Sequence, residues 1–325
     1  MNERLKIKRD FSDFSLGDPI LKALNPEGKQ FMRIRWLRDS HPFTSSWGIK
    51  VAALIPFGDF VHLKMIPTFM MMQEDLEEGR YDGITTLVVP SSGNTAHAAV
   101  RLAPCFDFRH TKIIMANDVP DAKVAVLKVM PNVTVIQCAN VTATAIEEAK
   151  SPQHYLFDQY SHMGNVRAHE LYTGEEVWRL IGKDLSAIAV AMGSGGTIAG
   201  IGRALRKNES EAVVIGVRPK LGEQVPGARD AKKMEEISRL PWKTEVEHLA
   251  EISRRQAFEH MVSLWSEVEP QPGPTSGLAW AGLEQYLDGL QSRELDALSG
   301  KVVAFICPDD YRLYTSAIMA ELDPK

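Results

Sequence analysis

The chain has 325 residues, which is enough for about two packed domains. Hydrophobic residues make up 44% and charged residues 24%, a balance typical of globular proteins and far from that of disordered ones. The formal net charge of -5 excludes a general electrostatic nucleic-acid binder, which needs a basic surplus to neutralise phosphates.

Apolar stretches and cysteine usage predict a cytoplasmic protein. The longest apolar runs, such as Ala187 to Met192, are too short to cross a bilayer, so we expect no membrane partner. The N-terminal segment alternates charges and has no apolar core, so we expect no signal peptide. Cys105, Cys138 and Cys307 lie far apart without metal or redox spacing, which predicts reduced thiols and no metal site.

From about residue 84 onward, short apolar runs alternate with segments of helical period. The predicted strands are Ile84–Val89, Lys112–Ala116, Val133–Cys138, Ala187–Met192, Ala212–Val217 and Val302–Cys307. The predicted helices include Val141–Lys150, Val166–Ile181, Thr197–Lys207 and Ser253–Trp265. Strands that are apolar on both faces and separated by helices predict an α/β fold with mainly parallel sheets. Ligands in such folds bind beyond the carboxyl ends of strands.

A glycine-rich loop, Gly193-Ser-Gly-Gly-Thr197, follows one predicted strand directly and precedes a helix. Glycine lets the backbone turn sharply and approach a ligand, and the amides that begin a helix favour an anion such as phosphate. Ile198 stands where a dinucleotide fingerprint needs glycine, and no lysine follows the loop as in a P-loop. We interpret the segment as a phosphate-binding loop of another kind rather than a ligand-free tight connection.

A second polar loop, Pro90-Ser-Ser-Gly-Asn-Thr95, follows the predicted strand Ile84–Val89 and begins a helix of small residues. Its hydroxyl groups and helix start suit an anion such as a carboxylate. Taken by itself, the loop is explained as well by N-capping through Ser92 or Asn94.

The two loops, in this order and about a hundred residues apart, resemble the pyridoxal-phosphate enzymes of the tryptophan-synthase β fold, also called fold type II. Within that family the likeness is greatest to the cysteine synthase and cystathionine β-synthase group. Further resembling segments are Asn165 to Trp178, Val214 to Val217, Val225 to Arg229 and Gly273 to Gly277.

The resemblance implies two α/β domains with mainly parallel sheets and a cofactor cleft between them. The smaller domain would comprise residues 42–165, and the larger one residues 1–41 plus 166–325 with the phosphate loop. Pyridoxal 5'-phosphate is the implied cofactor, and a homodimer is the implied assembly.

The resemblance also implies the residues that hold the cofactor. Its phosphate would be held by Gly193, Ser194, Gly195, Gly196 and Thr197. Asn94 would hydrogen-bond the phenolic oxygen of the ring, and Thr275 would meet the pyridine nitrogen. A hydroxyl rather than a carboxylate at that nitrogen implies β-elimination rather than transamination.

The implied substrate residues are those that would receive the carboxylate of an amino acid: Ser91, Ser92, Gly93 and Thr95. Gln159 matches the active-site glutamine of the family, although the flanking residues Tyr160 to Met163 differ from its pattern.

The catalytic Schiff-base lysine of the family usually stands early in the chain, at the start of a helix. The corresponding stretch here is His41 to Leu54. One register puts Gly48 at the lysine position and leaves the chain without this residue. The other aligns Ile49-Lys50-Val51 with an apolar-Lys-Val pattern and gives Lys50, with a small-residue helix after it. We favour Lys50 and keep the first register as the alternative.

Two further segments depart from the family pattern. Asp310 replaces a small polar residue near the expected cofactor region, so ring electronics or substrate space would differ. Four methionines, Met65, Met70, Met71 and Met72, cluster in a stretch expected to be rich in loops. Adaptable core packing explains them better than an altered substrate wall.

The function implied is pyridoxal-phosphate-dependent β-elimination or β-replacement on an activated serine-type amino acid, as in cysteine synthase. The Ser-Ser-Gly-Asn-Thr form of the second loop favours replacement by a nucleophile over deamination. The alternative is a rewired or inactive relative that lacks the Schiff-base lysine and binds a phosphorylated ligand or a protein partner. The sequence leaves the leaving group, nucleophile and product open.

Overall fold

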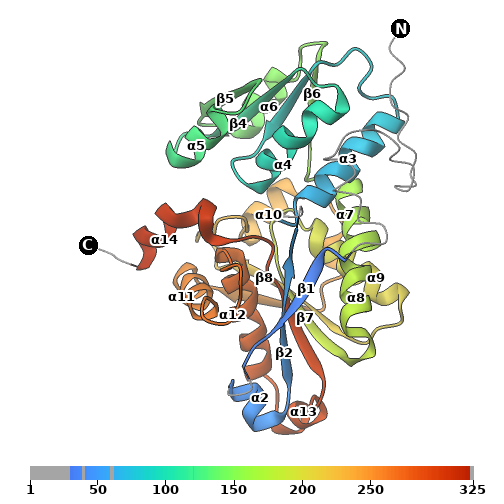
Figure 1. Ribbon diagram of the computed structural model, residues 1–325, viewed down its shortest axis with the longest axis vertical. Helices are drawn as coiled ribbons and strands as arrows, with labels where there is room; N and C mark the ends of the chain where they lie inside the picture. The colour runs from blue at the N-terminus through green and yellow to red at the C-terminus, as the bar shows by residue number, and fades with distance from the viewer. Residues whose placement is uncertain (1–29, 39–40, 59–61, 120, 323–325) are drawn as a thin grey trace. The chain divides into compact units, whose positions relative to one another are not determined.

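The computed structural model describes residues 30–38, 41–58, 62–119 and 121–322. Within these residues the chain forms two compact units, a smaller one of residues 64–164 and a larger one of residues 30–63 and 165–322 (Figure 1). Residues 1–29, which belong to the expected larger domain, lie outside the described residues. The predicted α/β architecture with mainly parallel sheets is confirmed.

The larger unit is built on a six-stranded sheet with the order β1-β2-β10-β7-β8-β9. Its strands are β1 (Met32–Trp36), β2 (Lys50–Pro56), β7 (Leu185–Ala191), β8 (Val213–Pro219), β9 (His248–Ile252) and β10 (Val302–Ile306). β1 runs antiparallel to β2, and the other pairings of this sheet are parallel. The central strands are apolar at nearly every position because both faces of the sheet are covered.

Helices cover both faces of this sheet, with α11 and α12 on one side and α8 and α9 on the other (Figure 1). The α-helices described here are α2 (Pro42–Trp47), α7 (Gly164–Ala168), α8 (Glu175–Ile181), α9 (Gly196–Lys207), α10 (Ala231–Ile237), α11 (Arg254–Leu264), α12 (Pro274–Asp288), α13 (Ser292–Ala297) and α14 (Thr315–Leu322). Local sequence sets the starts: Ser253 and Gln256 form a capping box for α11. Proline at the first position suits the start of α12.

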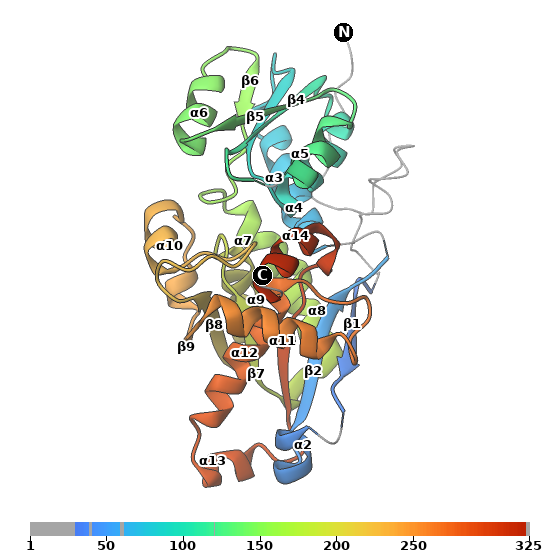
Figure 2. The ribbon, with the colours of Figure 1, turned by 90° about the vertical axis from the view of Figure 1, so that its left-hand side faces the viewer.

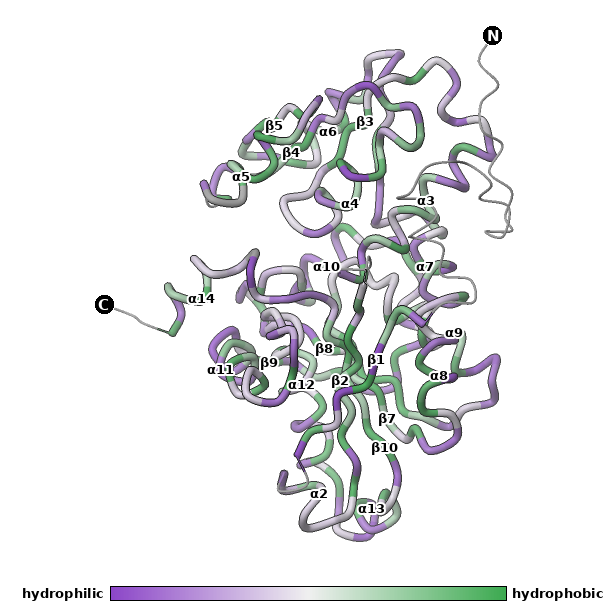
Figure 3. Tube along the Cα trace, viewed as in Figure 1, coloured by the Kyte–Doolittle hydropathy of each residue, from purple (hydrophilic) through white to green (hydrophobic). Residues whose placement is uncertain are grey.

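The smaller unit has a four-stranded parallel sheet with the order β5-β4-β3-β6. Its strands are β3 (Thr86–Pro90), β4 (His110–Ala116), β5 (Val133–Cys138) and β6 (His154–Leu156). Its helices are α3 (Met65–Glu77), α4 (Asn94–Leu102), α5 (Asp121–Lys128) and α6 (Val141–Glu148). Figure 2 shows α6 and α5 on opposite sides of the sheet. The tube coloured by hydropathy shows apolar residues along the strands, as expected for sheets covered on both faces (Figure 3).

Each sheet reverses its strand order at one point. In the smaller unit, β4 and β5 lie on one side of β3, and β6 lies on the other. In the larger unit, β8 and β9 lie on one side of β7, and β10 lies on the other. Ligand sites of open α/β sheets occur beyond the carboxyl ends of strands at such a reversal. The polar loop after β3 and the glycine-rich loop after β7 both occupy this position.

Three expectations about residues 42–72 differ from the structure. β2 pairs with both β1 and β10, so residues 42–63 lie in the larger unit and the smaller unit begins at Lys64 among the described residues. The helix expected after Lys50 is strand β2, because a run of small and branched apolar residues buried on both faces suits a sheet interior. The expected loop-rich stretch contains helix α3, whose buried Met71 and Met72 agree with core packing.

Candidate active site

The glycine-rich loop Gly193–Thr197 joins the carboxyl end of β7 to the start of α9. Gly195 is the N-cap residue with φ of 89°, a left-handed conformation that favours glycine. A Cβ on Gly195 would lie 2.7 Å from Cδ1 of Trp242. A Cβ on Gly193 would lie 2.5 Å from the carbonyl oxygen of Gly227. The backbone therefore passes its neighbours too closely for any side chain at these positions.

The N-cap residue of α9 is glycine and provides no side-chain cap, and the Gly196 amide makes only a long hydrogen bond of 3.4 Å to the Ser194 hydroxyl, so the first turn and the helix dipole can bind an anion. The loop before the helix is held from two sides. The Ser194 hydroxyl accepts a 3.1 Å hydrogen bond from Nδ2 of the buried Asn165, and the Ser194 carbonyl accepts one of 2.7 Å from the Ser238 hydroxyl. These contacts give the loop a fixed shape.

Thr197 continues the loop into the first turn of α9 and contacts a buried histidine. The Thr197 hydroxyl lies 3.1 Å from Nε2 of His169, and Nδ1 of the same ring lies 2.9 Å from the Thr173 hydroxyl. His169 and Thr173 belong to a π-helical turn, His169–Gly174, between α7 and α8. A Cβ on Gly200 would lie 2.4 Å from Cβ of His169, so α9 approaches this turn closely. The sequence comparison used this segment for the resemblance but gave these two residues no role.

A buried hydroxyl lies on the same side of the larger unit as the glycine-rich loop. Thr275, in the first turn of α12, is 5% exposed, and its Oγ1 has no hydrogen-bond partner among the described residues. Its Cγ2 would lie 3.0 Å from a Cβ on Gly227, the residue whose carbonyl borders Gly193. The glycine-rich loop can bind an anion, and the buried Thr275 hydroxyl has no partner among the described residues. Together these two features fit a phosphorylated ring that has a nitrogen acceptor.

Asp310 lies beyond the carboxyl end of β10 and forms an ion pair with Arg312. Burial opposes ionisation of its carboxyl group, but hydrogen bonds from Arg312 hold its pKa below the usual value. The Arg312 side chain contacts both carboxylate oxygens, at 3.0 and 2.5 Å. His62 adds positive potential at Asp310. The preceding residue Asp309 receives a 3.1 Å hydrogen bond at its carbonyl from Gly273, which fixes the start of α12.

The polar loop of the smaller unit lies between β3 and α4, and the structure brings Gln159 to it. The Thr95 hydroxyl donates a 2.9 Å hydrogen bond to Oε1 of Gln159, and both side chains are buried. The Gly93 amide donates to the Ser91 hydroxyl at 3.3 Å, and no side chain caps α4. Ser92 is half-buried, and Asn94 begins the helix. The expected substrate residues therefore form one group at the reversal of the four-stranded sheet.

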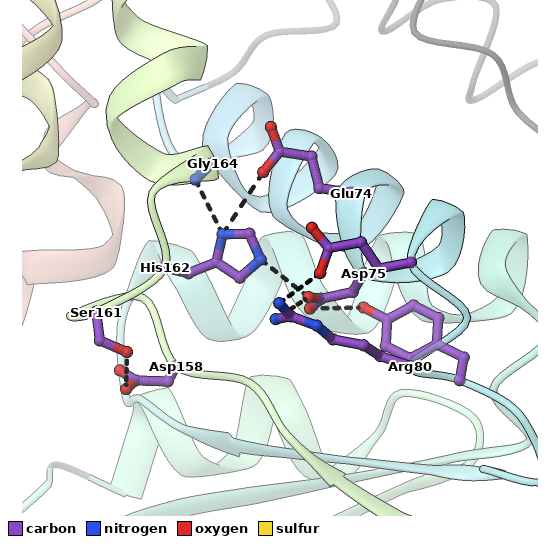
Figure 4. A network of polar contacts seen from close by, with 9 residues as sticks. Glu74, Asp75, Arg80, Asp158, Ser161, His162 and Gly164 are labelled. Atoms are coloured by element: carbon purple, nitrogen blue, oxygen red, sulfur yellow. Dashed lines mark hydrogen bonds and ion pairs between the residues drawn. The ribbon is translucent and has the colours of Figure 1, made fainter.

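The segment that carries Gln159 is anchored to α3 by His162 (Figure 4). Its Nε2 lies 2.9 Å from Oδ1 of Asp75, and its Nδ1 accepts a 2.9 Å hydrogen bond from the Gly164 amide. Just before it, the Asp158 carboxylate accepts hydrogen bonds from the Tyr160 amide and the Ser161 hydroxyl, at 2.8 and 2.6 Å. The residues that differ from the family pattern thus form a closed turn of their own.

Asp75 is the centre of this network and is only 1% exposed. In addition to His162 it contacts Nη1 of Arg80 at 2.9 Å (Figure 4). The Tyr81 hydroxyl donates a 3.3 Å hydrogen bond to Oδ2 of Asp75. Burial, with the nearby Asp75 charge, raises the pKa of Tyr81 well above its usual value, so this phenol stays protonated and donates. The carboxylate is therefore compensated from several sides, as a buried charge requires.

The structure does not bring Lys50 to the glycine-rich loop of the larger unit. Lys50 is an exposed residue that begins β2 and is paired with Val302, which begins β10. The glycine-rich loop follows the opposite, carboxyl end of β7, a strand parallel to β10. A seven-residue strand spans about 20 Å, so Lys50 lies at the far edge of the sheet. Gly48, the residue of the alternative register, lies at that edge as well.

A second lysine, Lys64, which the sequence analysis did not select, is half-buried at the N-cap position of α3. The Leu63 amide donates a 2.9 Å hydrogen bond to the carbonyl of Pro308, which follows β10. Leu63, the residue directly before Lys64, is therefore held at the carboxyl edge of the six-stranded sheet. The sequence signal for this lysine is an apolar residue and a lysine directly before a methionine-rich helix. This signal is informative because the Schiff-base lysine of the family stands at a helix start.

Residues 63–309 match the pyridoxal-phosphate dependent enzyme family, which is most of the chain. The chain belongs to this family, whose fold is the one described above, and its cofactor is pyridoxal phosphate. The matched region begins one residue before Lys64 and leaves Lys50 outside.

Among curated proteins, the chain is 25% identical over 266 residues to cysteine synthase B of Escherichia coli, covering 77% of this chain and 82% of that protein. It is 28% identical over 166 residues to cystathionine beta-synthase of Apis mellifera, covering 47% of this chain and 32% of that protein. Among solved structures, O-ureido-L-serine synthase superposes with a TM-score of 0.78 at 16% identity, over 95% of this chain and 97% of that one. The last likeness concerns the fold alone.

Two further classes of feature were sought in the part of the chain that the structure describes. No helix there has the length and apolar character needed to span a bilayer. No group of three or more His, Cys, Asp or Glu side chains is arranged there to bind a metal ion.

Proposed function

We propose that this chain catalyses β-elimination or β-replacement on an activated serine-type amino acid with pyridoxal phosphate, as a lyase or transferase. The observation that carries the proposal is the glycine-rich loop at the uncapped start of α9, together with the unpartnered buried hydroxyl of Thr275. An anion site and a neutral hydroxyl for a ring nitrogen are what this cofactor requires.

We assign each polar group of the cofactor to residues that the sequence analysis selected. Its phosphate is assigned to Gly193, Ser194, Gly195, Gly196 and Thr197. Asn94 is assigned to the phenolic oxygen and Thr275 to the pyridine nitrogen. When bound, pyridoxal phosphate supplies an electron sink for negative charge at the substrate Cα. A neutral hydroxyl at the ring nitrogen moderates that sink and favours elimination.

The proposed covalent lysine is Lys64, in place of Lys50. Its position at the N-terminus of α3 agrees with the helix start at which the family carries this residue. A neutral amine at this point can bond to the cofactor and then move the proton at the substrate Cα.

The proposed substrate site is the loop after β3. The carboxylate of the amino acid is assigned to the hydroxyls and amides of Ser91, Ser92, Gly93 and Thr95, with Gln159 fixing Thr95 through their hydrogen bond. The uncapped N-terminus of α4 adds a favourable dipole for this anion.

The likeness to cysteine synthase B and to the fold of O-ureido-L-serine synthase supports an O-substituted serine or another β-substituted alanine as substrate or product. The leaving group and the nucleophile are best determined by a screen of O-acyl, O-phospho and O-ureido serines with sulfide and other nucleophiles. The expected homodimer and cytoplasmic location remain part of this proposal. The free thiols of Cys138 and Cys307 agree with a reducing compartment.

The decisive experiment is reconstitution of the purified protein with pyridoxal phosphate, followed by borohydride reduction and peptide mapping. We expect a visible absorbance band that reduction removes and a single modified peptide that contains Lys64. Modification at Lys50 would refute the Lys64 assignment. Failure to bind the cofactor would refute the whole proposal and leave the rewired, non-catalytic relative as the better description.

A further inference from the structure

We propose that Thr173 and His169 are positioning residues that orient the hydroxyl proton of Thr197 toward the phosphate bound at the glycine-rich loop. The inference rests on the proposed function, because it concerns the phosphate of the cofactor. It assigns a role to a buried row of polar side chains in contact with the glycine-rich loop.

The geometry is a relay of three side chains within the larger unit. Thr173 Oγ1 lies 2.9 Å from Nδ1 of His169, and Nε2 of the same ring lies 3.1 Å from Oγ1 of Thr197. Both distances are those of hydrogen bonds. Thr173 and His169 are fully buried, at 0% exposure. The close passage of Gly200 over His169 Cβ limits the movement of the ring.

A buried imidazole between two hydroxyls is favoured in its neutral form, because burial penalises the charged one. A neutral ring carries one N–H donor and one acceptor nitrogen, so two proton arrangements are available. In one, Nδ1–H donates to Thr173, and Nε2 accepts the proton of Thr197. In the other, the Thr173 hydroxyl donates to Nδ1, and Nε2–H donates to the oxygen of Thr197.

The bound ligand decides between these arrangements. A phosphate group at the start of α9 presents acceptor oxygens, so it needs donors from the protein. The Thr197 hydroxyl has one proton, and it can donate to phosphate only if it does not donate to His169. The arrangement with Nε2–H therefore matches phosphate binding. It requires Thr173 to supply the proton at Nδ1, which explains why a second hydroxyl stands behind the ring.

The first test reads the tautomer of His169 by long-range 1H–15N correlation on the reconstituted protein, with its resonances assigned by their loss in His169→Gln. We expect the neutral ring with the proton on Nε2. A proton on Nδ1, or a doubly protonated ring, would overturn the inference.

The second test compares Thr173→Val with Thr173→Ser. Valine keeps the shape but removes the donor to Nδ1, so we expect the dissociation constant for pyridoxal phosphate to rise about tenfold, with a shifted 31P resonance of the bound phosphate. Serine keeps the hydroxyl, so it should restore both values.

The outcomes separate the two proposals. If the wild-type protein does not bind pyridoxal phosphate, the proposed function fails. If it binds and Thr173→Val matches both wild type and Thr173→Ser in affinity and 31P shift, the positioning role alone is refuted. An equal loss in both variants would indicate packing at this site rather than proton ordering, and would also refute it.

Discussion

The backbone amide of Leu63 donates a 2.9 Å hydrogen bond to the carbonyl oxygen of Pro308, which joins the chain just before α3 to the turn after β10. Lys64 follows this fixed point directly and is the N-cap residue of α3. We expect Lys64→Ala to lower turnover by on the order of 10²–10⁴-fold, because both the covalent bond to the cofactor and the proton carrier are lost. Steady-state kinetics and the loss of the borohydride-reducible absorbance measure this.

Lys50→Ala is the matched control for that variant. Lys50 is exposed at the amino edge of the six-stranded sheet, so its removal should change neither absorbance nor turnover. If Lys50→Ala abolished the reducible absorbance and Lys64→Ala did not, the assignment of the two lysines would be reversed.

The Gly195→Val variant tests the phosphate loop. A Cβ there would lie 2.7 Å from the Trp242 ring, and the backbone has φ of 89°. We expect loss of cofactor retention, measured as bound pyridoxal phosphate after dialysis. Gly222→Val is the control, because Gly222 also has a positive φ, of 81°, but open space where its Cβ would lie. Equal cofactor content in the two variants would argue against a phosphate site at this loop.

Gln159→Ala should weaken amino-acid binding and leave the cofactor in place. The variant removes the partner of the buried Thr95 hydroxyl, so we expect KM for the amino acid to rise by about tenfold. The absorbance of the bound cofactor serves as the internal control. A drop in cofactor content with unchanged KM would place Gln159 elsewhere in the site.

Asp75→Asn tests the buried network of the smaller unit. The substitution removes the negative charge that Arg80 and His162 share but keeps an acceptor oxygen, and we expect a loss of about 3 kcal/mol in the free energy of unfolding. Glu147→Gln breaks the exposed pair with Lys150 in the same unit and should cost less than about 0.5 kcal/mol. Urea unfolding of both variants provides the comparison, and equal losses would contradict the role of burial.

The pair of His260 and Glu284 predicts a pH dependence of stability. Their hydrogen bond of 2.7 Å raises the pKa of His260. A raised pKa contributes stability that is complete below the unfolded value of about 6.5 and is lost as pH rises through the folded value. We expect His260→Gln to destabilise the protein by about 1 kcal/mol at acidic pH and less at alkaline pH. A loss that does not change with pH would contradict the ion pair.

Sequence periodicity located the central strands β3, β4, β7, β8 and β10 and the edge strand β5, whose predicted bounds Val133–Cys138 agree at both ends. It missed β9 and predicted a helix in place of β2, and two more strands that it missed are of a different kind. β1 is an antiparallel edge strand with arginines, and β6 has only three residues. Neither has the continuous apolar run that marks a central parallel strand.

The loops of the site could be predicted because their chemistry is local: a strand end, glycines or hydroxyls, and a helix start. The proposed Schiff-base lysine could not be predicted from the sequence, because Lys50 and Lys64 both follow an apolar residue. The difference between them is that one begins a strand and the other a helix. Whether the segment after Lys50 forms a strand depends on the pairing of β2 with β1 and β10, and local sequence does not encode this tertiary pairing.

The position of β10 in its sheet has a consequence for the order of folding during synthesis. β10 comes after every other strand of the six-stranded sheet in the chain, yet it lies between β2 and β7. Until residue 306 has left the ribosome, those two strands have no common neighbour, and the larger sheet cannot close. The smaller unit has its four strands in one continuous segment and can fold while its host is still incomplete. During synthesis, the chain can therefore contain a folded smaller unit inserted in the sequence of a larger unit whose sheet still lacks β10.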